Sequence, residues 1–183
     1  MQTIKGKRLE LLHTTHPENL TDLLLSLRTT ERGILTSEIL HDPVLLPDIK
    51  KAIERVAHAR HNRERVMIFG DYDVDGISST AALFLFLRDE LGMDVSYRLP
   101  HRVHDGYGIK SYHMDEIAKT GTRLIITVDC GTKDREPIEH ARVLGMDVIV
   151  TDHHSCPQIL PECIAVINPQ RTDSLYPFRG LSG

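Results

Sequence analysis

The stretch VMIFGDYDVDGISST, residues 66–80, decides the fold. Four apolar residues predict a short strand, acidic residues follow at alternate positions, and a helical pattern begins at Ile77. The same alternation recurs along the chain. Strands are predicted at 66–69, 95–99, 124–128, 148–151 and 164–167, and helices at 77–91, 111–119 and 135–144. Because parallel neighbours need such crossovers, we expect an α/β fold, a doubly wound and mostly parallel sheet of about five strands flanked by helices.

The N-terminal part of the chain has a different pattern. Residues 1–64 carry helical patterns without a chemical motif, and the strand patterns begin after them. Apolar residues at three- and four-residue spacing, with Pro47 and Asp48 near the start, predict a helix over about 46–62. We therefore expect a helical N-terminal lead-in, 1–64, followed by the α/β domain, 65–183.

Composition excludes several classes of protein. The chain has 183 residues, is 40% hydrophobic and carries a net charge of −4. It contains no apolar run near the ~20 residues of a membrane span and no basic-plus-apolar leader, so we expect no membrane contact and a cytoplasmic location. Cys130, Cys156 and Cys163 form no CxxC pair, which argues against a disulfide scaffold or a zinc ribbon. The net charge alone leaves the substrate class open.

Acidic residues and histidines follow three of the predicted strands. In open α/β sheets, ligands bind beyond the carboxyl ends of the strands, so these three loops are expected at one edge of the sheet. The loops are Gly70 to Gly76 with Asp71, Asp73 and Asp75, then Asp129-Cys130-Gly131, and then Asp152-His153-His154.

The first of these loops suits divalent cations. Carboxylates at alternate positions of an extended segment lie ~6.6 Å apart on one side, a spacing that two cations ~4 Å apart would bridge. Ser78, Ser79 and Thr80 open the next helix, whose free N–H groups favour a phosphate. Two alternatives remain open. One is a solvated acidic turn with Asp75 capping the helix, and the other is an EF-hand loop, although that loop needs a preceding helix and a late Glu where this chain has Ala82.

The other two loops are weaker signals when each is taken alone. Asp129-Cys130-Gly131 is also typical of a turn in which the glycine supplies an unusual backbone angle. Asp152-His153-His154 offers two imidazoles and a carboxylate, which suit manganese, magnesium or iron better than calcium, but a surface histidine pair is the alternative. Three such loops in one sheet favour a shared metal site.

Four motifs together resemble the RecJ-type single-strand exonucleases of the DHH phosphoesterase superfamily. GDYDVDGISST at 70–80, VDCG at 128–131 and DHH at 152–154 match family motifs, and HRVHDGYG at 101–108 matches the RecJ-like segment that contains DGYG. The resemblance spans about residues 46–183 in the family's order.

That resemblance implies a role for each residue of the motifs. Asp73, Asp75, Asp129 and His153 are implied as ligands of two divalent cations, Mn²⁺ or Mg²⁺, with Asp129 between them and Asp71 as a ligand or a supporting partner. His154 is implied as a phosphate contact or proton-transfer group that Asp152 orients. The phosphate would also contact the segment that holds His101, Arg102 and His104, where Arg102 has the geometry for a bidentate contact.

The implied activity is metal-dependent hydrolysis of phosphodiester bonds in single-stranded DNA from the 5′ end, in DNA repair and recombination. Two cations neutralise the phosphate and lower the pKa of the attacking water. Repair or recombination proteins are possible partners, and the oligomeric state is not predicted. Two alternatives are a phosphodiesterase for short oligonucleotides or cyclic dinucleotides, and a non-catalytic replication scaffold, whose expected feature is loss of the acidic ligands.

The C-terminal residues Arg179 to Gly183 resemble the start of a family segment that precedes another helix. In family members a further metal-binding aspartate, a second domain and an oligonucleotide-binding fold follow. The resemblance therefore implies a catalytic domain truncated at its C-terminus. We expect the 183 residues alone to have weak or absent nuclease activity.

Overall fold

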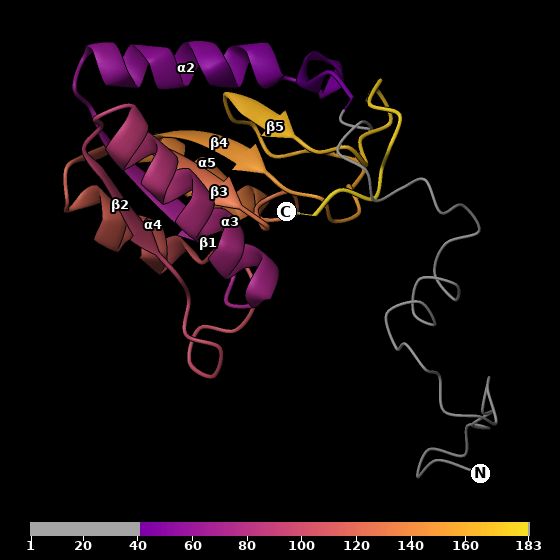
Figure 1. Ribbon diagram of the computed structural model, residues 1–183. Coiled ribbons are helices and arrows are strands. Elements are labelled where there is room, and N and C mark those ends of the chain that lie inside the picture. The colour runs from indigo at the N-terminus through magenta and orange to yellow at the C-terminus, as the bar shows by residue number, and fades with distance from the viewer. Residues whose placement is uncertain (1–40, 183) are drawn as a thin grey trace, which may run out of the picture. The chain divides into compact units, whose positions relative to one another are not determined.

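The computed structural model describes residues 41–182, which form a parallel sheet with helices on both faces (Figure 1). The strands are β1 (Arg65–Gly70), β2 (Val95–Arg98), β3 (Thr122–Val128), β4 (Asp147–Thr151) and β5 (Ala165–Ile167). The helices are η3 (Pro43–Leu45), α2 (Ile49–His61), α3 (Val74–Leu85), η4 (Phe86–Glu90), α4 (Ser111–Ala118) and α5 (Arg135–Val143). The expected α/β class and the five-stranded parallel sheet are confirmed.

The strand order β2-β1-β3-β4-β5 places a topological switch point between β1 and β3. From β1 the chain moves outward to β2, then returns to the other side of β1 and continues outward through β3, β4 and β5. All four strand pairs are parallel, so the carboxyl ends of all five strands lie at one edge. A switch point is where open α/β sheets bind their ligands, and the loops after β1 and β3 flank it.

Alternate residues of each central strand serve two separate cores. In β1, Met67 and Phe69 pack with α4 and α5 residues, whereas Val66 and Ile68 pack with residues of α2 and η4. Strands buried on both faces need continuous apolar sequence, which explains why the central strands are unbroken apolar runs. This two-sided burial holds the strand ends, and the loops that follow them, in fixed positions.

One predicted helix has a different start and a different end. The helix expected at 77–91 begins at Val74, because the carboxylate of Asp73 caps it by accepting a 3.0 Å hydrogen bond from the Gly76 N–H. It ends at Leu85, and the chain continues as the π-helical turn η4 to Glu90. Asp75, which the capping alternative had placed at the N-cap, lies instead in the first turn.

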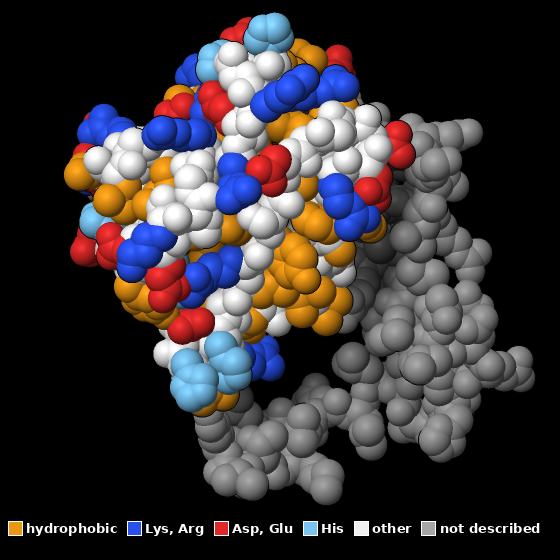
Figure 2. Space-filling view, turned by 90° about the vertical axis from the view of Figure 1, so that its left-hand side faces the viewer, with side chains coloured by type: hydrophobic (Ala, Val, Ile, Leu, Met, Phe, Trp, Pro, Cys, Tyr) orange, Lys and Arg blue, Asp and Glu red, His pale blue; other side chains and the backbone are white. Residues whose placement is uncertain are grey.

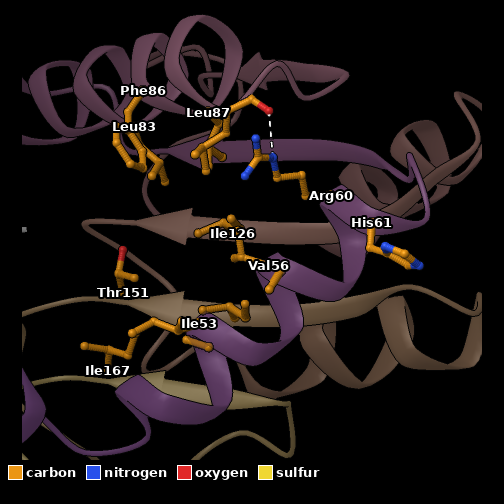
Figure 3. Close-up of a pocket in the computed structure, with 14 residues that line it drawn as sticks. Ile53, Val56, Arg60, His61, Leu83, Phe86, Leu87, Ile126, Thr151 and Ile167 are labelled. Atoms are coloured by element: carbon orange, nitrogen blue, oxygen red, sulfur yellow. Dashed lines mark hydrogen bonds between the residues drawn. The ribbon is translucent and has the colours of Figure 1, made fainter.

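An apolar cavity of about 670 Å³ lies between α2 and the α3–η4 segment, over the sheet (Figure 3). Ile53 and Val56 line it from α2, Leu83 and Phe86 from the other wall, and Ile126 from its floor. It lies over the face that carries the Val66 and Ile68 core. Most of the side chains that line the cavity are apolar, and few are charged or polar. The cavity could therefore bury an apolar group.

The helix expected at 46–62 is present as α2, and its Ala52 and Ala59 are buried against the sheet. The remainder of the expected lead-in, residues 1–40, lies outside the described residues. Within 41–182, none of the helices has the length and apolar character needed to cross a membrane.

Candidate metal centre

The loop after β1 places two carboxylates beside the first turn of α3. Asp71 is buried, and one of its carboxylate oxygens accepts a 2.8 Å hydrogen bond from the Tyr72 N–H. Asp73 is more exposed and caps α3. A side chain at Gly76 would come within 2.5 Å of the Asp71 carbonyl oxygen, so only glycine allows this loop to close over the helix.

The loop after β3 holds Asp129 in a left-handed backbone conformation, with φ of 60°. Its backbone N–H donates a 3.0 Å hydrogen bond to the Thr151 carbonyl, which continues the pairing with β4 by one residue. Left-handed backbone costs a non-glycine residue ~1 kcal/mol or more, and aspartate is among the few residues that tolerate it. The turn directs the Asp129 side chain to a site where only 1% of it is exposed.

The loop after β4 is organised by Asp152. One of its carboxylate oxygens accepts hydrogen bonds from the backbone N–H groups of His153 and His154, at 2.7 and 3.1 Å, and lies 2.7 Å from Nδ1 of the His154 ring. The other oxygen accepts a 3.0 Å bond from the Thr132 N–H. Since Nδ1 of His154 is engaged, Nε2 is the nitrogen that faces away from Asp152.

The three loops converge on Asp129. Nε2 of His153 lies 3.0 Å from one Asp129 oxygen and 3.7 Å from an oxygen of Asp75. Candidate ligand atoms of Asp71, Asp73 and Asp129 lie within 4.8 Å of one another, and so do those of Asp129, His153 and His154. Asp129 belongs to both groups and is therefore the common member of two adjacent sites.

Asp129 also supplies the test of whether a cation fits. Both of its carboxylate oxygens are buried and, among the described residues, neither has a donor in hydrogen-bonding geometry. Burial, and then the nearby charges of Asp73 and Asp75, raise the pKa of Asp129 to about 6. A buried carboxylate without donors is costly, and a divalent cation would satisfy its oxygens and remove the repulsion between these aspartates. The donor set of carboxylate oxygens and imidazole suits Mn²⁺.

The neighbouring carboxylates show how local hydrogen bonds control charge. Burial raises the pKa of Asp71, against the effect of its hydrogen bond from Tyr72. The hydrogen bond from the Gly76 N–H lowers the pKa of Asp73. Burial raises the pKa of Asp152, but its bonds from Thr132 and His154 outweigh burial, and the net direction is downward.

The segment 101–108 borders this centre. The Arg102 guanidinium lies over the Tyr72 ring at 4.8 Å. This stacking holds the positive charge of Arg102 beside the loop after β1. His101 and His104 are exposed, and their rings are 4.5 Å apart. The Tyr107 hydroxyl lies 3.4 Å from Nδ1 of His154, so this segment reaches the histidine loop.

The residues predicted at the phosphate do not all occupy equivalent positions. Ser78 is exposed near the start of α3, whereas the Ser79 hydroxyl donates a 2.7 Å hydrogen bond to the Asp75 carbonyl within the helix. Thr80 is only 3% exposed and packs against Gly70, where a side chain would collide with its hydroxyl. Burial therefore separates Thr80 from the exposed edge where we had placed it.

Sequence reasoning missed four residues that shape the centre. Tyr107 contacts His154, and Asp134 accepts a 3.2 Å hydrogen bond from the Ile109 N–H, which fixes the end of the 101–108 segment. Buried Thr132 and Asn168 support the loops after β3 and β4. DGYG gave a signal for Tyr107, but Asn168 lies in an Asn-Pro pair that is typical of any turn.

Comparison with known proteins identifies relatives of this chain. Single-stranded-DNA-specific exonuclease RecJ of Escherichia coli (strain K12) is 36% identical over 190 residues, which cover 100% of this chain and 33% of that protein. Its namesake from Bacillus subtilis (strain 168) is 36% identical over 180 residues, covering 92% of this chain and 23% of that one. The chain thus spans about a third or less of the length of these two relatives.

Solved structures show the same fold. A crystal structure of exonuclease RecJ bound to manganese matches with a TM-score of 0.67 and 32% identity, covering 73% of this chain and 34% of that chain. RecJ of Thermus thermophilus in complex with Mn²⁺ matches with a TM-score of 0.60 and 28% identity, covering 75% of this chain and 18% of that one. The model of the DHH family, N-terminal domain, matches residues 65–175. Because that match covers more than half of the residues of this chain, the chain belongs to the DHH family.

Proposed function

We propose that this chain carries most of the metal centre of a 5′ to 3′ single-stranded-DNA exonuclease that acts in DNA repair and recombination in the cytoplasm. The observation that carries the proposal is the convergence of Asp73, Asp75 and His153 around Asp129. The buried oxygens of Asp129 have no partner in hydrogen-bonding geometry within residues 41–182, although Nε2 of His153 lies 3.0 Å from one of them. The RecJ relatives supply the substrate class, because their names specify single-stranded DNA.

The proposed ligands are Asp71, Asp73, Asp75, Asp129 and His153, with Asp129 shared between two cations, Mn²⁺ or Mg²⁺. Bound there, the cations would neutralise the scissile phosphate and acidify the attacking water. The protein contributes pre-organisation, because the backbone of Asp129 and the cap made by Asp73 fix both carboxylates before any ligand arrives.

The proposed phosphate contacts surround the ligands. His154 presents Nε2 because Asp152 engages Nδ1, and it would hold a phosphate oxygen or transfer a proton there. Arg102 would bind a phosphate oxygen while its guanidinium remains stacked on Tyr72. His101, His104, Ser78 and Ser79 are further proposed contacts, and the buried Thr80 is better explained as packing beneath Gly70.

Charge on the surface beside β2 is mixed rather than basic. Acidic and basic side chains are interspersed on the face shown in Figure 2. Two ion pairs lie close to β2, Arg98–Glu116 at 2.5 Å and Arg65–Asp94 at 3.0 Å. Paired charges of this kind leave little net attraction for a DNA backbone.

The test is hydrolysis by the full gene product, with the 183-residue chain assayed beside it. The substrates are single-stranded DNA with a 5′-phosphate and a 3′ label, the same strand blocked at its 5′ end, a duplex, and a cyclic dinucleotide. We expect Mn²⁺-dependent release of mononucleotides from the free 5′ end of the single strand only. Because the 183 residues span a third or less of these relatives, we expect them to be weak or inactive when assayed alone.

Each other outcome contradicts the proposal in a distinct way. Turnover of the cyclic dinucleotide without degradation of the strand would assign a small-molecule phosphodiesterase. Mn²⁺ binding that is equal in wild type and Asp75→Ala, with no turnover of any substrate, would favour a non-catalytic scaffold. Degradation from the 3′ end would contradict the polarity.

A further inference from the structure

A buried amide lies behind the histidine loop. Asn168 follows β5 and is fully buried, and its side-chain nitrogen donates to the His154 carbonyl at 2.9 Å and to the Thr132 hydroxyl at 3.0 Å. Its side-chain oxygen accepts a 2.8 Å hydrogen bond from the Gln170 N–H. One side chain therefore joins the loops that follow β3, β4 and β5.

Asn168 and Asp152 hold the same two segments by different groups. Asp152 binds the Thr132 N–H, the His154 N–H and the His154 ring, whereas Asn168 binds the Thr132 hydroxyl and the His154 carbonyl. The backbone of His154 is thus held on both sides of its Cα, at its N–H by Asp152 and at its carbonyl by Asn168. Because a ring hydrogen bond of 2.7 Å depends on where that peptide lies, displacing the carbonyl would also displace the imidazole.

We propose that Asn168 is a positioning residue that sets the imidazole of His154, with Nδ1 on Asp152 and Nε2 directed to the phosphate. This inference rests on the proposed function, in which His154 contacts the phosphate. Asn168 itself touches neither the proposed ligands nor the substrate, and acts through the His154 peptide. The distinction from a merely structural residue is that its loss changes turnover and the state of the ring, rather than stability alone.

The principal variant is Asn168→Asp, which keeps the shape and the acceptor for Gln170 but places an oxygen against the His154 carbonyl. We expect kcat for Mn²⁺-dependent hydrolysis to fall ~10- to 100-fold in the full gene product, with KM and the Kd for Mn²⁺ changed less than ~3-fold. The matched control is Gln170→Ala in the same loop. Within residues 41–182 the Gln170 side chain donates a hydrogen bond to the Arg179 carbonyl, at 2.7 Å, so this variant should leave kcat unchanged.

A double-mutant cycle tests whether the effect passes through His154. In a His154→Ala background, Asn168→Asp should lower kcat no further, because the group that it positions is gone. Thr132→Val provides a second route if Asn168→Asp fails to fold. It removes the hydroxyl that accepts from Asn168 and that also hydrogen-bonds Asp152, so it should lower kcat in the same direction. If the fold-decrease in kcat of the double variant equalled the product of the fold-decreases of Asn168→Asp and His154→Ala, the two residues would act independently and the proposal would be overturned.

Nitrogen-15 NMR of the histidine rings separates this inference from the proposed function. Wild type should show His154 with its proton on Nδ1, and the Asn168 variant should shift both ring-nitrogen resonances. If no DNA hydrolysis is found but the resonances shift, the exonuclease assignment fails and the positioning role stands. Unchanged His154 resonances in a folded variant would overturn the positioning role whatever the activity.

Discussion

Asp129 and Asp152 follow neighbouring strands and are almost equally buried, at 1% and 5% exposed, yet their surroundings are opposite. Asp152 accepts hydrogen bonds from three backbone N–H groups and pairs with a ring nitrogen, whereas Asp129 has no donor in bonding geometry among the described residues. Burial, and then the charges of Asp73 and Asp75, raise the pKa of Asp129 to about 6, while the donors lower the pKa of Asp152 despite its burial. Donors, rather than the degree of burial, distinguish Asp129, which we propose binds a cation, from Asp152, which organises a loop.

The largest expected effect comes from Asp129. Asp129→Asn removes the charge shared by both proposed cation sites while keeping the side chain's size. We expect Mn²⁺ affinity to fall more than ~100-fold and hydrolysis by the full gene product to fall ~10³-fold or more. Calorimetric titration with Mn²⁺ and initial rates measure the two effects, and wild-type binding by the variant would remove Asp129 from the centre.

The same substitution should stabilise the metal-free protein. The folded-state pKa of Asp129 is raised from 3.8 to about 6, so its contribution favours folding below pH ~4 and is lost as the pH rises through 6. At pH 7 with a chelator, Asp129→Asn should therefore be more stable than wild type by ~1–3 kcal/mol, and at pH 4 the two should be nearly equal. Urea unfolding at both pH values measures this.

With manganese added at pH 7, wild type should become more stable than Asp129→Asn, because wild type gains the binding energy that the variant lacks. A wild type that is the more stable protein at pH 7 in chelator would show that Asp129 has partners within the protein. In that case the contrast with Asp152 would disappear.

A smaller effect is expected at Asp152. Asp152→Asn leaves the proposed cation ligands in place but weakens the acceptor of the His154 ring and of the Thr132 N–H. We expect kcat to fall ~10- to 100-fold while the Kd for Mn²⁺ changes less than ~5-fold. A loss of Mn²⁺ binding as large as that of Asp129→Asn would contradict the division between the two aspartates.

The smallest effect is expected at the edge of the centre. Arg102→Lys keeps the charge but loses the planar group stacked on Tyr72, so KM for single-stranded DNA should rise ~3- to 10-fold with kcat nearly unchanged. Arg88→Lys is the matched control, because Arg88 also lies over an aromatic ring, that of Phe84 at 4.8 Å, but belongs to η4 and not to the 101–108 segment. An equal rise of KM in the two variants would show that the place of Arg102 beside the loop after β1 does not matter.

Most of the fold was predictable because burial on both faces leaves a mostly apolar run in the central strands β1, β3 and β4. The predicted strand 66–69 appears as Arg65–Gly70, and 124–128 as Thr122–Val128. The start of α3 was misplaced because Asp73 caps it, and both Asp73 and Asp75 are plausible caps in the sequence. The π-helical turn η4 had no sequence signal that we recognised.

The candidate centre was predictable where it contains residue types that packing of the fold does not require, such as clustered acidic residues and histidines after strands. Three acidic loops after strands indicated a shared edge, and the structure brings Asp129 and His153 to 3.0 Å. The left-handed backbone of Asp129 was not predictable, because it depends on pairing with Thr151 far along the chain. Asn168 was missed for the same reason, since its bonds to Thr132 and His154 exist only once β5 is in place.

The most direct test is anomalous X-ray diffraction at the manganese edge, from crystals of the full gene product grown with MnCl₂. The account predicts anomalous peaks in contact with the carboxylate of Asp129, with Asp75 and His153 among the other ligands and Asp152 still bonded to His154. A protein that binds manganese elsewhere, with Asp129 contacting no peak, would contradict the account.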